Sequence, residues 1–177
     1  DGRFDGAGRV VLNLRVEGTT YVGGVFGALD RSASVVNLGI QDANITGESA
    51  LGMLACINKG HIAACRADGT VDGLYGIGGL VCLNQGSISD SYTVGEVSAF
   101  APTAVGGLTG RNRGSIRQCY AAAHITHLLS AQADTNGVGG LVGDNNETDD
   151  PWPLYPPGQV YDSYFLIDVD GGGPDNG

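Results

Sequence analysis

The segment Ile77-Gly-Gly-Leu-Val-Cys-Leu-Asn-Gln-Gly-Ser-Ile-Ser-Asp-Ser-Tyr92 recurs as Val105-Gly-Gly-Leu-Thr-Gly-Arg-Asn-Arg-Gly-Ser-Ile-Arg-Gln-Cys-Tyr120. Looser copies begin at Val22, Leu51 and Val138. The leading glycines of the five copies stand at positions 23, 52, 78, 106 and 139, so the spacing is 29, 26, 28 and 33 residues. A recurring period of this size is typical of a repeat architecture in which each copy forms one structural unit.

The pattern inside each copy favours short strands over helices. Apolar residues alternate with polar ones, Asn-x-Gly turns separate them, and no stretch carries an apolar face of helical period. Such copies predict an all-β fold, a right-handed parallel β-solenoid of about five to six coils with a period of 26–33 residues, whose core forms when the coils stack. The predicted single domain covers 1–177, with repeats near 21–49, 50–74, 75–103, 104–137 and 138–166 and an acidic, glycine-rich tail at 167–177.

Equivalent positions of successive copies are expected to stack into columns, because neighbouring parallel strands lie ~4.8 Å apart. Three aliphatic rows are predicted in the core: Leu54, Leu80, Leu108 and Leu141; Ile62, Ile88, Ile116 and Val160; and Ile45, Val71, Val97 and Ile125. A fourth column consists of the asparagines Asn58, Asn84, Asn112 and Asn145. We interpret it as a structural ladder, in which the side-chain amides bond along the column and hold the turn.

The motifs carry a family resemblance. Val138-Gly-Gly-Leu-Val-Gly-Asp-Asn145 and Gly86-Ser-Ile-Ser-Asp-Ser-Tyr92 resemble GLUG repeats, and the resemblance covers about residues 4–165. GLUG repeats occur in large secreted or surface-bound bacterial proteins, including adhesin-like proteins and non-catalytic parts of immunoglobulin A peptidases. The resemblance implies a non-catalytic structural or adhesive module that is extracellular or on the cell surface. The copy at Leu51 has Met53 where the pattern has its second glycine, so we expect local distortion there.

The charge distribution restricts the partners. The chain has 177 residues and a net charge of −10, and residues 130–177 hold nine acids and no Lys or Arg. Nucleic acid is excluded as a partner because phosphate binding needs a basic surface, and no apolar run reaches the ~18 residues of a membrane span. The expected partners are flanking repeats of a longer chain or identical subunits end to end, with surface glycans or proteins in addition. A head-to-tail fibre and a polysaccharide-binding or polysaccharide-degrading β-helix remain open as alternatives.

The candidate ligand-binding residues are aromatic. Tyr92, Tyr120 and Tyr164 align in the repeats, while Arg66 takes this position in the preceding copy. If they point outward, they form a strip on which sugar rings can stack; if they are inward or half-buried, they are stacked core residues, which is the interpretation we favour. Trp152, in the proline-rich insertion 146–158, is a second candidate.

No motif predicts catalysis, and we expect the chain not to be an enzyme. It lacks His-Glu-x-x-His and a nucleophile elbow. The one candidate metal site is Asp168, Asp170 and Asp175, where alternating acids followed by glycines could hold calcium, although an acidic turn or linker is the favoured interpretation. No other cofactor is expected.

Four cysteines leave two interpretations open. Cys56 and Cys82 share a register in neighbouring coils, within disulfide reach, but stacked residues have parallel Cβ vectors that suit a disulfide poorly. Cys65 and Cys119 are two coils apart and too distant to bond. We favour free buried thiols that act as small apolar residues, with a Cys56–Cys82 bond as the alternative.

Overall fold

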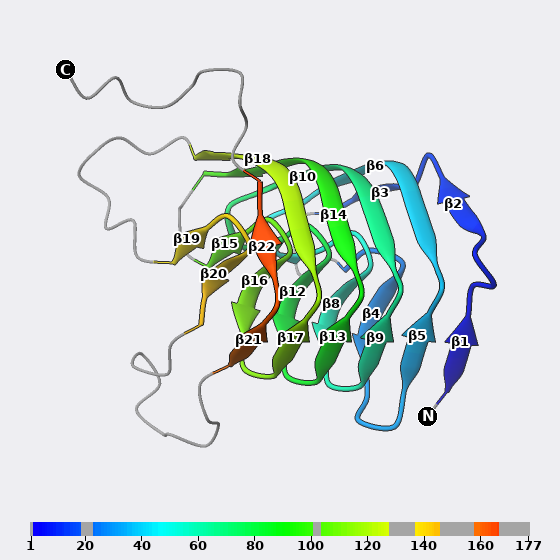
Figure 1. Ribbon diagram of the computed structural model, residues 1–177. Helices are drawn as coiled ribbons and strands as arrows, with labels where there is room; N and C mark the ends of the chain where they lie inside the picture. The colour runs from blue at the N-terminus through cyan, green and yellow to red at the C-terminus, as the bar shows by residue number, and fades with distance from the viewer. Residues whose placement is uncertain (1, 19–22, 101–103, 128–136, 146–157, 167–177) are drawn as a thin grey trace.

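The chain forms a parallel β-solenoid in a computed structural model that describes residues 2–18, 23–100, 104–127, 137–145 and 158–166 (Figure 1). All strand pairings among these residues are parallel, and no helix occurs among them. Four complete turns of four strands each, β4–β7, β8–β11, β12–β15 and β16–β19, lie between a partial turn at either end. The predicted all-β parallel solenoid is therefore confirmed, with four complete turns and a partial turn at either end where the repeats predict five to six coils.

Each complete turn passes in order through four sheets, which we name C, A, B and D. Sheet C contains β4 (Phe26–Leu29), β8 (Ala55–Asn58), β12 (Val81–Asn84), β16 (Thr109–Asn112) and β20 (Val142–Asp144). Sheet A contains β1 (Arg3–Asp5), β5 (Ser34–Val36), β9 (His61–Ala63), β13 (Ser87–Ser89), β17 (Ser115–Arg117) and β21 (Gln159–Tyr161).

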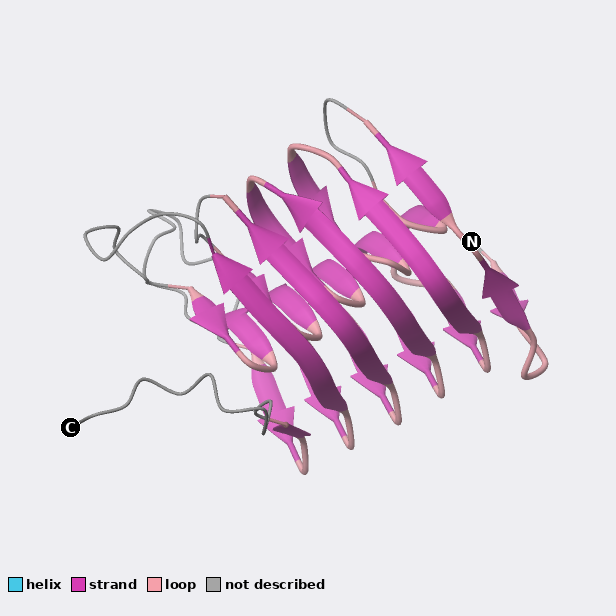
Figure 2. Ribbon diagram, turned by 90° about the horizontal axis from the view of Figure 1, so that it is seen from above, coloured by secondary structure: helices cyan, strands magenta, loops and turns pink. Residues whose placement is uncertain are grey.

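The other two sheets differ most in strand length. Sheet B has the long strands β6 (Gly39–Thr46), β10 (Arg66–Gly73), β14 (Tyr92–Ala99) and β18 (Tyr120–His127), with the shorter β2 (Val10–Leu12), β3 (Arg15–Glu17) and β22 (Tyr164–Phe165). Sheet D contains β7 (Ser49–Leu51), β11 (Tyr75–Gly78), β15 (Val105–Gly106) and β19 (Val138–Gly139). Figure 2 shows the long strands of sheet B side by side along the solenoid axis.

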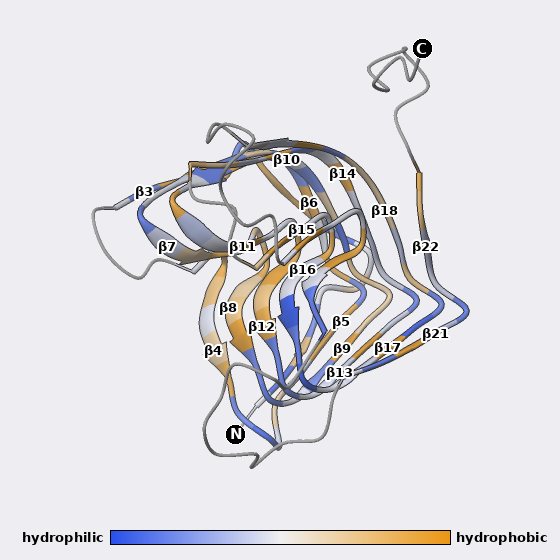
Figure 3. Cartoon of the chain, turned by 90° about the vertical axis from the view of Figure 1, so that its left-hand side faces the viewer, coloured by the Kyte–Doolittle hydropathy of each residue, from blue (hydrophilic) through white to orange (hydrophobic). Residues whose placement is uncertain are grey.

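The core consists of the aliphatic rows that the repeats predict. Leu54, Leu80 and Leu108 are fully buried. The matching members of the other two rows are buried as well, except Ile125 on β18, which is partly buried. In the last partial turn the rows become exposed to solvent, and Val160 is 38% exposed there. Figure 3, seen along the axis, shows apolar residues on β8 and β12 beside hydrophilic corners. Burial of each large aliphatic side chain stabilises the stack by about 1.5–3 kcal/mol.

The coil that departs from the repeat pattern keeps its register. Strand β8 aligns Ala55 with Phe26 on one side and with Val81 on the other. Met53 is 1% exposed and belongs to the core. The predicted distortion of this coil is wrong, because the flexible Met53 side chain fits the space that the stacked turns leave.

Candidate functional site

The asparagine column is a continuous hydrogen-bonded ladder along sheet C. Asn58 Nδ2 donates to Asn84 Oδ1 at 2.8 Å, Asn84 Nδ2 donates to Asn112 Oδ1 at 2.8 Å, and Asn112 Nδ2 donates to Asn145 Oδ1 at 2.9 Å. The last rung donates to the Gly158 carbonyl oxygen at 2.9 Å, immediately before β21. The predicted structural ladder is confirmed.

Each asparagine also holds the turn that follows its own strand. The backbone N–H groups of Gly60, Gly86 and Gly114 donate to the side-chain oxygen of the asparagine two residues earlier, at 3.0–3.3 Å. The corner between sheets C and A is therefore satisfied by the same side chains that bond along the axis. This arrangement explains why an uncharged polar residue with both a donor and an acceptor is buried at each turn.

The tyrosine column lies on the outer face of sheet B. Tyr92 and Tyr120 are stacked at 4.7 Å between ring centroids and 6° between planes, and Tyr120 and Tyr164 at 5.5 Å and 8°. The next residue along the strand, Thr93, is fully buried and points into the solenoid, so Tyr92 points outward. Tyr92 and Tyr120 are partly exposed and Tyr164 is 57% exposed. The stacking and the half-buried state of Tyr92 and Tyr120 agree with the favoured interpretation, but none of the three tyrosines belongs to the core cluster.

Two features surround this column. Arg66 pairs in register with Tyr92, so a cation continues the column toward the N-terminal turns, as the repeat alignment predicts. Burial, the first cause, and the neighbouring Tyr92 and Tyr164 raise the pKa of the Tyr120 hydroxyl above its ordinary value of 10.0. On sheet A the guanidinium of Arg117 lies 5.1 Å from the centroid of the Tyr161 ring.

The four cysteines are free thiols, as the favoured interpretation predicts. Cys65 and Cys119 share a register, as the repeats predict, and the serines that alternate with them in this column are what the repeat comparison missed. The backbone N–H of Cys65 donates to Ser91 Oγ at 3.1 Å and that of Cys119 to Ser163 Oγ at 3.0 Å. The signal was present in the sequence, since each of these residues directly precedes the residue of the Arg/Tyr column.

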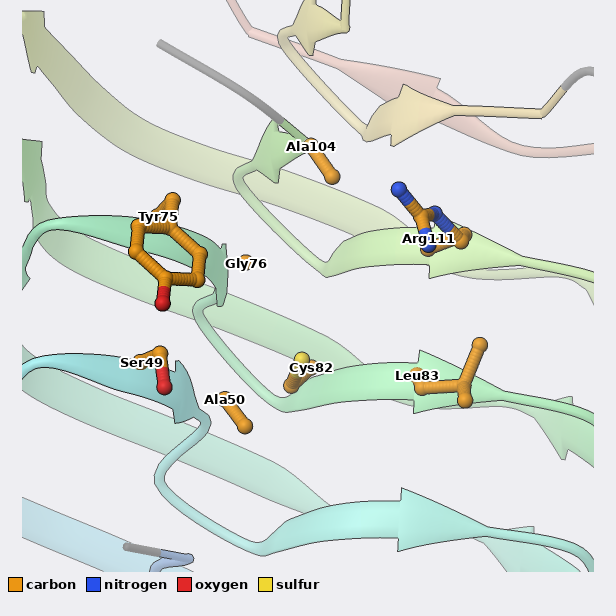
Figure 4. A pocket seen from close by; sticks show the side chains of 8 residues that line it. All are labelled: Ser49, Ala50, Tyr75, Gly76, Cys82, Leu83, Ala104 and Arg111. Atoms are coloured by element: carbon orange, nitrogen blue, oxygen red, sulfur yellow. The ribbon is translucent and has the colours of Figure 1, made fainter. Parts of the chain in front are cut away.

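A pocket of about 280 Å³ lies where sheets C and D meet on the outside of the solenoid (Figure 4). Four small residues of its lining, Ala50, Gly76, Ala104 and Cys82, lie between the larger side chains, and we call them the floor (Figure 4). Its sides are formed by Ser49, Tyr75, Leu83 and Arg111. Sequence reasoning missed this pocket.

The backbone at the junction of sheets C and D explains the concave shape. At this junction each complete turn has one residue in the left-handed region: Ala50 (φ 60°), Gly76 (φ 66°), Ala104 (φ 55°) and Gly137 (φ 97°). The sequence signal is the small residue two positions before each leading glycine from 52 onward. A left-handed residue turns the chain sharply, and the absence of a long side chain leaves the corner open.

The remaining predicted site residues are not part of this geometry. Trp152, Asp168, Asp170 and Asp175 lie outside the described residues, so the predicted calcium site and the insertion remain predictions. Within the described ranges no group of three or more His, Cys, Asp or Glu side chains is placed to hold a metal ion. In the same part of the chain no helix is long and apolar enough to cross a membrane.

The fold and its columns define a parallel β-solenoid protein built from stacked repeats. No family model matches the chain, so the GLUG resemblance stays a prediction. The chain is 38% identical to halomucin from Haloquadratum walsbyi over 73 residues, which are 41% of this chain and 1% of halomucin. The fold is similar to the crystal structure of a candidate immunoglobulin A1 protease from Bacteroides ovatus, with a TM-score of 0.68, 18% identity and coverage of 94% of this chain and 60% of that one. The chain thus spans less than two thirds of either protein, and the structural likeness concerns the fold alone.

Proposed function

We propose that the chain is a non-catalytic structural and adhesive repeat module, located outside the cell or on its surface. The observation that carries the proposal is the column of Tyr92, Tyr120 and Tyr164, stacked on the outer face of a rigid sheet. An exposed row of aromatic rings that protrudes from a preorganised frame gives contact area with little loss of side-chain entropy on binding. The names of the two similar proteins, a halomucin and a candidate immunoglobulin A1 protease, are compatible with an extracellular place.

The test is binding of the purified chain to an array of immobilised polysaccharides and glycoproteins. The triple variant Tyr92→Ala, Tyr120→Ala, Tyr164→Ala should lose at least about tenfold in apparent affinity, because stacking on exposed rings is removed. The matched control is Val94→Ala, on the outer face of the same strand β14 and 37% exposed, which should bind like wild type. Adhesion through the tyrosine column is refuted if wild type binds nothing on the array or if the triple variant binds equally well.

Catalysis is tested with the same polysaccharides in solution. A non-catalytic module leaves their chain length and their number of reducing ends unchanged after long incubation. Release of new reducing ends, proportional to the amount of chain added, would replace the proposal by the polysaccharide-degrading alternative.

A second candidate function, end-to-end assembly, is favoured by the partial turns. The last described turn exposes Tyr161 by 42% and Phe165 by 50%, and the first exposes Phe4 by 45%. Further strands could pair with these turns, either from flanking repeats of the same chain or from an identical chain. Sedimentation over a concentration series, with electron micrographs of the same samples, tests this candidate. End-to-end assembly predicts that the mass of the particles grows with concentration and that Phe165→Asp suppresses this growth. A stable monomer of 18.0 kDa contradicts self-assembly.

A further inference from the structure

The pocket between sheets C and D combines an aromatic wall, a neutral apolar floor and a paired cation. Tyr75 stands on the sheet D side and is 46% exposed, which leaves its ring available to a ligand. Arg111 and Leu83 stand on the sheet C side, on β16 and β12, with the floor residues between the two sides (Figure 4). The tyrosine column is on sheet B, so the pocket is a separate surface.

The floor carries no charge at neutral pH. Cys82 is 8% exposed, and burial, the largest cause, together with the neighbouring Cys56 raises the pKa of its thiol to about 12. The other floor residues, Ala50, Gly76 and Ala104, present only backbone and methyl groups. A ligand that lies on this floor therefore meets an uncharged surface.

The cation at the rim is already neutralised. Arg111 Nε donates to Asp144 Oδ2 at 2.9 Å, and the two side chains are 37% and 20% exposed. An anionic ligand would gain little from Arg111, because it would compete with Asp144 and approach a chain of net charge −10. A ligand with hydroxyl groups, by contrast, can bond to the guanidinium without breaking the ion pair.

We propose that this pocket binds a single neutral pyranose ring of a glycan. The apolar face of such a ring stacks on Tyr75 and on the floor, while its hydroxyl groups accept from Arg111. The volume of about 280 Å³ lies below the roughly 300–1,000 Å³ of pockets for drug-sized ligands, which limits the occupant to about one ring. The inference rests on the proposed adhesive function and adds to it a defined subsite away from the tyrosine column.

The test is a titration of the isotope-labelled 177-residue chain with methyl glycosides of glucose, galactose and mannose, followed by amide NMR shifts. At least one neutral glycoside should give saturable shifts at Gly76, Leu83 and Ala104. Tyr75→Ala should weaken this binding by at least about tenfold, Tyr75→Phe should retain it, and Arg111→Gln should weaken it as well. Val94→Ala, on the outer face of sheet B and 37% exposed, is the control and should bind like wild type.

Each contrary outcome is distinct. The absence of saturable shifts at the pocket with every neutral glycoside overturns the proposal, and so does unchanged binding by both Tyr75→Ala and Arg111→Gln. Methyl glucuronide binding more tightly than the neutral glycosides overturns the choice of a neutral ring. Array binding that depends on Tyr92, Tyr120 and Tyr164 while the pocket gives no shifts would leave the adhesive function standing and remove this subsite alone.

Discussion

The side-chain amide of Asn84 donates a 2.8 Å hydrogen bond to Oδ1 of Asn112 one turn further along, and neither side chain is more than 1% exposed. The same Asn84 accepts from Asn58 and from the backbone N–H of Gly86. One buried amide thus joins three consecutive turns and one corner. Because unpaired polar groups in a core are costly, these bonds make the register of the stack specific.

Replacement of an inner rung should be much more destabilising than replacement of the last one. Asn84→Ala leaves buried groups of Asn58 and Asn112 without their partner, so we expect a loss of about 3 kcal/mol in the free energy of unfolding. Asn145→Ala, at the exposed end of the ladder, should lose about 1 kcal/mol or less. Urea unfolding followed by circular dichroism gives both values; equal losses would contradict a cooperative buried ladder.

Two buried threonines should respond oppositely to the same substitution. Thr109 Oγ1 is the buried side-chain polar atom of the described residues that has no hydrogen-bond partner, and the residues in register with it are Val81 and Val142. Thr109→Val should therefore stabilise the chain by about 1 kcal/mol. Thr93 Oγ1 donates to the Gly107 carbonyl oxygen at 2.6 Å, so Thr93→Val should cost about 1–2 kcal/mol. Thermal unfolding of the pair checks the sign, and loss of stability in Thr109→Val would mean that its hydroxyl has a partner.

A methyl group should be tolerated at one glycine of the repeat motif and rejected at another. A Cβ at Gly107 would overlap the Gly140 carbonyl oxygen of the next turn, whereas a Cβ at Gly27 meets nothing within 4 Å. We expect Gly107→Ala to cost about 2 kcal/mol or more and Gly27→Ala to be within about 0.5 kcal/mol of wild type. Chemical denaturation of the two variants decides this, and similar stabilities would show that adjacent turns can separate without cost.

Stability should fall in alkali because of buried thiols. Burial is the main reason why the pKa of Cys82 rises to about 12 and that of Cys119 to about 11, from an ordinary value of 9.0. The folded chain keeps these thiols neutral while the unfolded chain ionises them. Their contribution is therefore complete below pH 9.0 and is lost as the pH rises toward about 11 and about 12.

The variant Cys119→Ser removes one of these thiols. Serine is compatible with this position because the same column already contains Ser91 and Ser163. Its free energy of unfolding should decline less steeply with pH than that of wild type, by up to about 1.4 kcal/mol per pH unit above pH 9. The measurement is urea unfolding at several pH values between 8 and ~10.5. Ser163→Ala, which removes no titrating group, should keep the wild-type slope; parallel curves for Cys119→Ser and wild type would contradict the assignment.

The repeats predicted whatever depends on equal spacing. Asn58, Asn84 and Asn112 share an offset from their leading glycines, and a parallel stack turns an equal offset into contact. The direction in which a column faces does not follow from the offset. Tyr92 and Thr93 are neighbours, and Thr93 occupies the interior because its hydroxyl finds a carbonyl acceptor there. The larger, aromatic residue is therefore on the outside and the smaller one is inside.

The pocket was beyond sequence reasoning for a different physical reason. Its shape depends on left-handed backbone conformations at Ala50 and Ala104, which alanine adopts only where the surrounding structure requires it. Small residues at these positions were visible, but their conformation is set by the stacking of sheets C and D. Met53 illustrates the same dependence, since a residue that breaks the repeat pattern is accommodated by the turns on either side.

The asparagine ladder has a consequence for how such a protein can change its length. Every inner rung gives one bond to the following turn and accepts one from the preceding turn. If a whole repeat is duplicated or deleted, every inner asparagine keeps an asparagine partner on both sides, because only the two terminal rungs lack one. Genetic recombination between repeats can thus lengthen or shorten the solenoid one turn at a time without redesigning its interior, so the reach of the protein can vary independently of its fold.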